Sequence, residues 1–422
     1  MKYHSYELAH TLLAPTRELS KLLINFYTHP LNPFAHTQLG RSIAAWCEVF
    51  ESVTRRYGKP AWGLTQTSVV GQPVPLREEV VYSTPFCDLL HFDRDEKVVG
   101  KRYDPKVLLV APMSGHYATL LRGTVEAMTR EHNLYITDWR DARNIPAMMG
   151  KFDLDDFIDH IIDFIRYIGT NTHVIAVCQP SVPVLAAAAV MAARNDPCRP
   201  ASVTLMGGPI DTRRNPTKVN EHAQSKSIDW FERNVIELVP WPNAGFLRRV
   251  YPGFIQLTGF MTMNLDRHLE AHKSLYENLV KGDCDSVQQH HTFYEEYLAV
   301  MDLPAEFYLQ TVKTVFQDHA LPNGTMRHRG ELVDCGAIRD TALMTVEGER
   351  DDICGLGQTE AAHDLCANLP PQLHYHYVQP GVGHYGVFNG TRWRTEIQPR
   401  IREMIRTVQF NRKRTERREA SA

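Results

Sequence analysis

The chain has 422 residues, 43% hydrophobic and 23% charged, which is the composition of an ordinary globular protein with a large core. Its 46 Lys and Arg nearly balance its 49 Asp and Glu, so charge gives no indication of nucleic acid as a partner. Because it has neither a basic-then-apolar leader nor an uncharged apolar run of the ~20 residues that a membrane span needs, we expect a cytoplasmic protein. Its eight cysteines lack C-x-x-C spacing and are expected to be reduced thiols.

The first part of the chain predicts helices. Apolar residues approximate one face of the first helix, at Leu8, Leu12, Leu22, Leu23 and Phe26. Pro30 and Pro33 interrupt this pattern, and a second helix is predicted over residues 37–57. We expect an N-terminal helical extension over residues 1–78 that packs on the protein's own core. Surface binding or dimerisation by these helices is the alternative.

Short strands are predicted from residue 79 onward. They fall at residues 79–82, 88–92, 107–111, 133–137, 172–177 and 202–206, with helices over residues 157–168 and 182–193. The first two strands are predicted to pair with each other at the start of the sheet. The later ones are apolar throughout and are joined by helices, as a parallel sheet covered on both faces requires. Residues 79–208 are therefore predicted to form the first part of an α/β core.

The alternation of strands and helices stops near Pro209. Residues 209–340 are rich in aromatic residues, Met and Asn, and predict helices but no strand. An insertion of this length usually forms a lid over a site. The core resumes over residues 341–410, with strands at 342–346 and 374–378. The basic end of the chain, residues 411–422, is predicted to be a disordered tail.

The segment AVCQPS, residues 176–181, joins a predicted buried strand to an alanine-rich helix. In α/β-hydrolases the nucleophile occupies such a turn, normally G-x-S-x-G, with small residues two positions to either side. Ala176 meets this requirement, whereas Pro180 departs from it but is tolerated in a first helical turn. A helix N-terminus also favours the thiolate form of Cys178. Cys178 is the candidate nucleophile, and a small buried structural cysteine is the alternative.

The candidate acid and histidine follow two later strands. In the segment VEGERDDI, Asp351 is placed to accept a hydrogen bond from a histidine ring and to fix its tautomer. Asp352 is its immediate rival, and Asp211 is a third, weaker candidate. In GVGHYG, the flanking glycines let the backbone bring His384 toward the site. The chain order nucleophile, acid, histidine is that of α/β-hydrolases.

An acyl-transfer site also needs N–H donors for the developing oxyanion. We expect these to be the backbone N–H groups of Gln179 and of Met113, which lies in the loop after the strand at 107–111. For the Met113 loop the alternative is a simple tight connection between a strand and a helix.

Two histidine pairs and one glycine-rich segment have some features of metal or cofactor sites. His374 and His376 share one face of a strand, and His290 is followed by His291, but neither pair has a third ligand at convincing spacing. The segment GLG at residues 355–357 lacks the third glycine of a dinucleotide-binding loop. We therefore predict no metal and no cofactor.

Longer sequence blocks carry a family resemblance. They are VCQP at residues 177–180, MGGPID at 206–211, VYPGF at 250–254, LMTVEGE at 343–349 and GHYG at 383–386. Over nearly its whole length the chain resembles intracellular poly(3-hydroxybutyrate) depolymerases. This resemblance implies an α/β-hydrolase fold with an N-terminal helical extension and a large, mainly helical lid insertion. It also assigns the catalytic cysteine, aspartate and histidine to Cys178, Asp351 and His384.

The implied substrate is amorphous polyester in storage granules, which the enzyme would cleave through a thioester on Cys178. Coenzyme A is chemically plausible as an acyl acceptor, because thioesters react readily with thiols. We expect the granule surface to be the partner, and a homodimer is compatible with the sequence, although no residue pattern indicates one. The alternatives are an acyltransferase of the polyester-synthase kind and a protein that only binds the granule.

Overall fold

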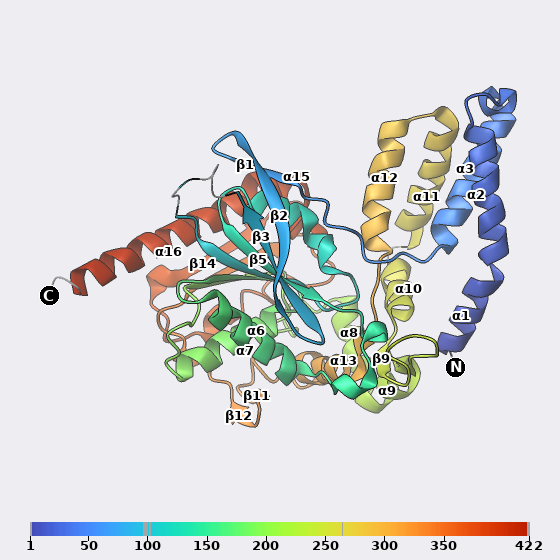
Figure 1. The fold of residues 1–422 in the computed structure, drawn as a ribbon. Coiled ribbons are helices and arrows are strands. Elements are labelled where there is room, and N and C mark those ends of the chain that lie inside the picture. Colours follow the sequence, from blue (N-terminus) through green and yellow to red (C-terminus); the bar gives the residue numbers. More distant parts are fainter. Residues whose placement is uncertain (1, 96–99, 101–102, 264, 420–422) are drawn as a thin grey trace.

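The centre of the molecule is a nine-stranded sheet in the order β1-β2-β3-β5-β4-β6-β7-β13-β14 (Figure 1). This computed structural model describes residues 2–95, 100, 103–263 and 265–419. The strands are β1 (Gln66–Val69), β2 (Gln72–Ser83), β3 (Cys87–Arg94), β4 (Lys106–Val110), β5 (Asn133–Trp139), β6 (His173–Val177), β7 (Ser202–Met206), β13 (Ala342–Gly348) and β14 (His374–Gln379).

The sheet is antiparallel at one edge and parallel in its larger part. Strands β1, β2 and β3 pair antiparallel, as do β3 and β5. From β5 through β4, β6, β7 and β13 to β14, all neighbours are parallel. Strands β6, β7 and β13 are buried at every residue, because helices cover both faces of the sheet. This is an α/β-hydrolase fold, as predicted.

The helices beside the sheet follow from local sequence signals. They are α5 (Arg122–Met128), α6 (Leu154–Ile168), α7 (Ser181–Ala193), α14 (Ala362–Leu365), α15 (Gly390–Arg392) and α16 (Gln398–Glu419). Helix α6 begins with a capping box between Asp153 and Asp156 and ends at Gly169. Helix α7 is buried at nearly every position, as its alanine-rich sequence allows. Helices α6 and α7 lie on one face of the sheet, and α15 and α16 lie on the other (Figure 1).

The insertion between β7 and β13 covers the carboxyl ends of the strands. Its helices are α8 (Lys218–Ser225), α9 (Ile228–Val235), α10 (Gly253–Met263), α11 (Leu265–Lys281), α12 (Cys284–Tyr297) and α13 (Ala305–Thr311). The prediction that it contains no strand is wrong: β8 (Glu237–Leu238), β9 (Arg249–Tyr251), β10 (Leu303–Pro304), β11 (Arg327–His328) and β12 (Glu331–Leu332) pair within it. These strands have two or three residues each, too few to give an alternating pattern in the sequence.

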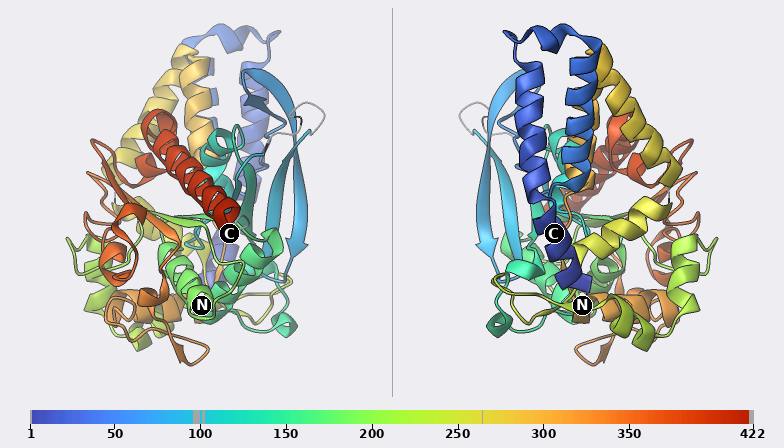
Figure 2. Two further views of the ribbon diagram at one scale, coloured as in Figure 1. Left: turned by 90° about the vertical axis from the view of Figure 1, so that its left-hand side faces the viewer. Right: turned by 90° about the vertical axis from the view of Figure 1, so that its right-hand side faces the viewer.

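The N-terminal helices form a projection together with two helices of the insertion. Helix α3 (Gln38–Thr54) packs against α11 and against α2 (Ala14–Thr28), whereas α1 (Lys2–Leu12) contacts α2 and β8. Helices α2, α3, α11 and α12 extend away from the core (Figure 2). The expectation that the apolar face packs on the core is wrong for most of its residues. Leu8, Leu12, Leu22 and Phe26 are all more than half exposed. The reason is that α2 turns its Arg17–Ser20 side toward α3 instead.

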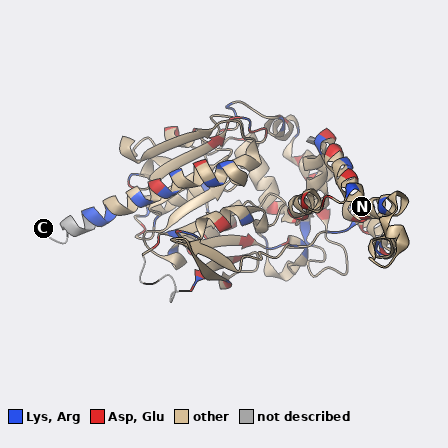
Figure 3. Ribbon diagram, turned by 90° about the horizontal axis from the view of Figure 1, so that it is seen from above, with Lys and Arg blue, Asp and Glu red and all other residues tan. Residues whose placement is uncertain are grey.

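Two predicted boundaries also differ in the structure. Strand β2 begins at Gln72 and β1 at Gln66, so the sheet starts before residue 79. Of the predicted disordered tail, residues 411–419 are helical instead, because α16 continues through residue 419, and Lys and Arg are frequent along it (Figure 3). Contacts hold this segment, since Arg412 donates to the Asp340 carbonyl at 3.0 Å and the Lys413 Nζ lies 3.7 Å from the Tyr103 ring centroid. Residues 420–422 lie outside the described residues. Of the helices described, none is both long and apolar enough to cross a membrane.

Candidate active site

Cys178 occupies a strained turn between β6 and α7. Its φ is +66°, a left-handed conformation that costs a residue with a Cβ roughly 1–2 kcal/mol. Two hydrogen bonds hold the turn: the Cys178 N–H donates to the Met206 carbonyl at 2.7 Å, and the Ser181 N–H donates to the Cys178 carbonyl at 3.0 Å. Such a turn lifts a side chain out of the strand end and is the geometry of a nucleophile elbow.

Two glycines at the end of β7 make room for this turn. At Gly208 a Cβ would lie 2.0 Å from the Ser181 Oγ, so any side chain there would displace the start of α7. Gly207 has a φ of +56°, and its Cβ would lie 3.3 Å from both the Asp351 Oδ2 and the His384 Cε1. The MGGP sequence after β7 therefore allows the close approach of three segments.

His384 and Asp351 form a buried pair beside Cys178. The His384 Nδ1 donates to the Asp351 Oδ2 at 2.8 Å, and these side chains are 6% and 0% exposed. The other Asp351 oxygen accepts from the Ile353 N–H at 2.9 Å and from the Cys354 N–H at 2.8 Å. These bonds fix the carboxylate, the ring orientation and the tautomer of the histidine.

The two rival carboxylates lie elsewhere. Asp211 forms an ion pair with Arg213, whose Nε lies 2.7 Å from the Asp211 Oδ1. Asp352 is exposed, and it lines a separate cavity between α11, α12 and the His384 loop. Of the three candidates, Asp351 alone carries a hydrogen bond to His384.

The environment of His384 favours its charged form. Burial opposes the imidazolium, but the charges of Cys178 and Asp351 and the hydrogen bonds to both outweigh it, so the pKa of His384 lies well above its ordinary value. A basic histidine beside a thiol is the group that can take up the thiol proton when the sulfur acts as a nucleophile.

Met113 and Gln179, the predicted oxyanion donors, line the same cavity as Cys178 and His384. The Met113 N–H donates weakly to the Gln179 side-chain Oε1 at 3.4 Å. The Gln179 side chain is only 9% exposed, and its Nε2 is buried without a hydrogen-bond partner among the described residues. A substrate oxygen in the place of the Gln179 Oε1 would therefore accept a hydrogen bond from the Met113 N–H.

The cavity at Cys178 lies between the sheet and the insertion and has a volume of about 500 Å³. Most of its walls are apolar or aromatic, and the insertion contributes Phe231, Tyr251, Phe260, Phe307 and Tyr308. Tyr251 belongs to the VYPGF block, whereas only the frequency of aromatic residues in the insertion points to the other four. A cleft of this size and character suits an apolar acyl chain.

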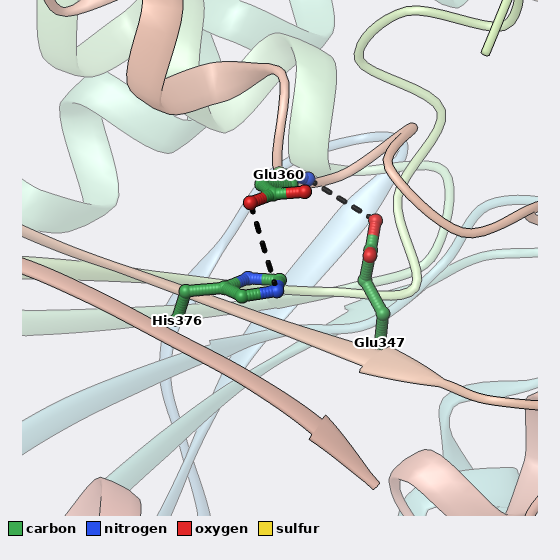
Figure 4. Close-up of side chains that lie close together, drawn as sticks. All are labelled: Glu347, Glu360 and His376. Atoms are coloured by element: carbon green, nitrogen blue, oxygen red, sulfur yellow. Dashed lines mark hydrogen bonds and ion pairs between the residues drawn. The ribbon is translucent and has the colours of Figure 1, made fainter.

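Glu347, Glu360 and His376 offer ligand atoms within 4.8 Å of one another (Figure 4). Glu347 is 2% exposed, and its two oxygens accept from the N–H groups of Gly357, Thr359 and Glu360. This carboxylate thus anchors the loop after β13. Thr359 in turn exchanges hydrogen bonds with both backbone groups of Gly208. Nothing in the sequence around Glu347 indicates that this residue positions the site.

Of the candidate metal-binding histidines, His374 and His376 belong to a row of hydrogen bonds with His363, whereas the His291 Nε2 lies 2.8 Å from the Glu48 Oε1. The Nδ1 atoms of His363 and His374 lie 2.8 Å apart, and His374 Nε2 donates to the Leu369 carbonyl. The Thr345 hydroxyl joins His363 to His376. Within the described chain, these rings form a hydrogen-bonded row along β13 and β14.

Residues 207–409 match the family model described as PHB de-polymerase C-terminus. The match covers slightly less than half of the chain. The matched region contains Asp351, His384 and the whole insertion, whereas Cys178 lies before it. No curated protein matches the chain significantly.

Solved structures with similar folds include hydrolases. One is a putative lipase from Acinetobacter baumannii AYE, with 10% identity, 80% of this chain and 93% of that chain covered, and a TM-score of 0.44. Another is 2-hydroxy-6-oxo-6-phenylhexa-2,4-dienoate hydrolase from Rhodococcus sp. strain RHA1, with 13% identity, coverage of 79% and 99%, and a TM-score of 0.42. A third is a putative non-heme bromoperoxidase from Mycobacterium tuberculosis H37Rv, with 13% identity, coverage of 81% and 98%, and a TM-score of 0.43.

Proposed function

We propose that this protein is an ester hydrolase that depolymerises poly(3-hydroxybutyrate) and related polyesters through Cys178, His384 and Asp351. The observation that carries the proposal is the strained backbone of Cys178, with φ +66°, beside the His384–Asp351 pair. A structural cysteine has no need of a left-handed turn, because its packing does not depend on projecting from the strand end.

The residues support a covalent mechanism. His384, oriented by Asp351, holds the proton of Cys178, and the thiolate attacks an ester carbonyl. The backbone N–H groups of Met113 and Gln179 receive the negative charge on the carbonyl oxygen. His384 then protonates the leaving alcohol, and a thioester remains on Cys178. Water, activated by His384, releases the acid, and coenzyme A could replace water as the acceptor.

The nature of the substrate rests on two independent supports. Residues 207–409 match a family model named for PHB depolymerisation. The cavity beside Cys178 is lined largely by apolar and aromatic side chains, which suits the methyl and methylene groups of a polyester.

We also propose that the enzyme acts at the surface of polyester granules in the cytoplasm. Large apolar side chains are exposed on the N-terminal helices, among them Leu12, Leu22, Leu39 and Trp46, which are between 66% and 70% exposed. A polyester surface carries no charge, so a protein binds it through apolar contacts, which an apolar face of this kind can make.

The test is release of soluble 3-hydroxybutyrate from amorphous polyester granules. We expect release by the wild type and by Cys284→Ala, a matched control in which an exposed cysteine on α12 is removed. Cys178→Ala should release none. Adding coenzyme A reveals thiolysis if 3-hydroxybutyryl-CoA appears. Release by Cys178→Ala at the wild-type rate would refute the role of Cys178, and no release by the wild type would refute the substrate.

A further inference from the structure

A second cavity of about 590 Å³ lies on the other side of His384. Helices α11 and α12 and the loop at residues 383–386 form its walls. It shares Phe260, Ile353, His384 and Tyr385 with the cavity that contains Cys178, so the two spaces meet at the catalytic histidine. Cys178, Gln179 and Met113 line only the first cavity.

This division matches the two halves of an ester. The acyl half becomes bonded to the cysteine sulfur while its oxygen lies on the N–H donors, so it must occupy the cavity that contains these groups. The alcohol half receives its proton from the histidine, so it must lie on the histidine side. We propose that the cavity between α11 and α12 holds the alcohol half of the polyester chain and recognises its terminal carboxylate. This inference rests on the proposed function.

The step balances without a further reactant. The thiolate forms a C–S bond, the ester C–O bond breaks, and the proton on His384 passes to the leaving oxygen. The product in the second cavity is then a 3-hydroxy acid or oligomer with a new hydroxyl at the His384 end and a carboxylate at the other end. After it leaves, water enters by the same space, gives its proton to His384, and breaks the thioester.

The lining of the second cavity is mixed, and it is more polar than that of the cavity at Cys178, as this product requires. Arg267, Ala271, Ser274 and Asn278 lie three or four positions apart on one side of α11 and line the cavity. Arg267 is the one Lys or Arg among the described lining residues. Burial lowers the pKa of His268 and also that of His290, the latter to about 4, so Arg267 remains the cation of the α11 and α12 walls at neutral pH.

The negative and the positive side chain of this cavity lie on different parts of its wall. Asp352 directly follows Asp351, the hydrogen-bond partner of His384, whereas Arg267 is on α11. Both charges are felt at Tyr297 of α12. The positive charge therefore belongs to the part of the cavity formed by α11 and α12, and the negative charge to the part near the reacting ester. A chain whose hydroxyl end is at His384 and whose carboxylate points toward α11 meets the matching charges.

The test compares esters that have the same acyl half and different alcohol halves. The methyl ester of 3-hydroxybutyrate loses only methanol, whereas the 3-hydroxybutyrate trimer loses an oligomer that must occupy the second cavity. We expect Ala271→Phe, which fills the cavity, to lower kcat/KM for the trimer about tenfold relative to the methyl ester. Lys273→Phe, on the exposed side of the same helix, is the matched control and should leave the ratio unchanged.

Arg267→Gln tests the carboxylate. We expect it to lower kcat/KM for the free trimer acid about tenfold and to leave the trimer methylated at its carboxyl end unaffected. Turnover of the methyl ester shows in each case that the variant is folded. Equal ratios in wild type, Ala271→Phe and Arg267→Gln would overturn this inference while the proposed function stood. If the wild type cleaved the methyl ester but no oligomer, the proposed function would fail instead.

Discussion

The Asp351 Oδ2 lies 2.8 Å from the His384 Nδ1, while the next residue, Asp352, lines the cavity on the far side of the histidine. Two adjacent carboxylates thus have separate surroundings because the chain turns between them. The turn is fixed by the Ile353 and Cys354 N–H groups, which both donate to the second oxygen of Asp351.

Asp351→Asn is expected to lower kcat roughly 10³- to 10⁴-fold, because an amide cannot stabilise the imidazolium and can hold the wrong tautomer. Asp211→Asn is the matched control and should retain most activity, since Asp211 pairs with Arg213 and not with His384. Initial rates on a soluble ester measure both. A larger loss in Asp211→Asn than in Asp351→Asn would contradict the assignment of the acid.

Gly207→Ala is expected to lower activity strongly at little cost to the overall fold. The new methyl group would lie 3.3 Å from atoms of both Asp351 and His384, and φ +56° disfavours alanine. Circular dichroism should show an unchanged fold, while turnover of the soluble ester falls. Wild-type kcat in this variant would show that the spacing between β7 and the histidine is less tight than the structure indicates.

Asp302→Asn is expected to change the pH dependence of stability. Asp302 is buried beside Asp141, accepts hydrogen bonds from the Tyr3 hydroxyl and the Gly253 N–H, and has a pKa raised by burial from 3.8 to about 7. The folded state therefore binds a proton that the unfolded state has lost between these pH values, and stability falls as pH rises from about 4 to 7.

An asparagine imitates the protonated acid and removes this effect. Thermal unfolding of the wild type and Asp302→Asn at intervals from pH 5 to 8 is the measurement. We expect the Tm of Asp302→Asn to increase relative to the Tm of the wild type as pH rises. A constant difference over the whole range would mean that Asp302 does not titrate in this window.

The sequence predicted most of what lies at the ends of the core strands. Strands β6 and β13 are mostly apolar and buried at every residue, and the short turns after them carry Cys178 and Asp351, so local pattern and chain order sufficed. The choice among Asp351, Asp352 and Asp211 required the three-dimensional structure, because all three residues follow strands. The role of Glu347 was also hidden, since its partners are backbone N–H groups, which any residue type can supply, in the loop that follows β13.

The helical parts were less predictable for a different reason. Leu22 and Phe26 have the spacing of a buried face, yet α2 packs on α3 through its other side, and nothing local to α2 distinguishes these arrangements. Likewise, the basic end of α16 has the composition of a solvated tail, and its contacts with Asp340 and Tyr103 come from segments far away in the chain.

The central claim is that the acyl group passes through a thioester on Cys178. The most direct measurement is peptide mapping by mass spectrometry after rapid acid quenching of the enzyme with the methyl ester of 3-hydroxybutyrate. The account predicts a 3-hydroxybutyryl adduct on the peptide that contains Cys178, which hydroxylamine removes, and no adduct in Cys178→Ala. An adduct on another residue, or undiminished turnover by Cys178→Ala, would contradict it.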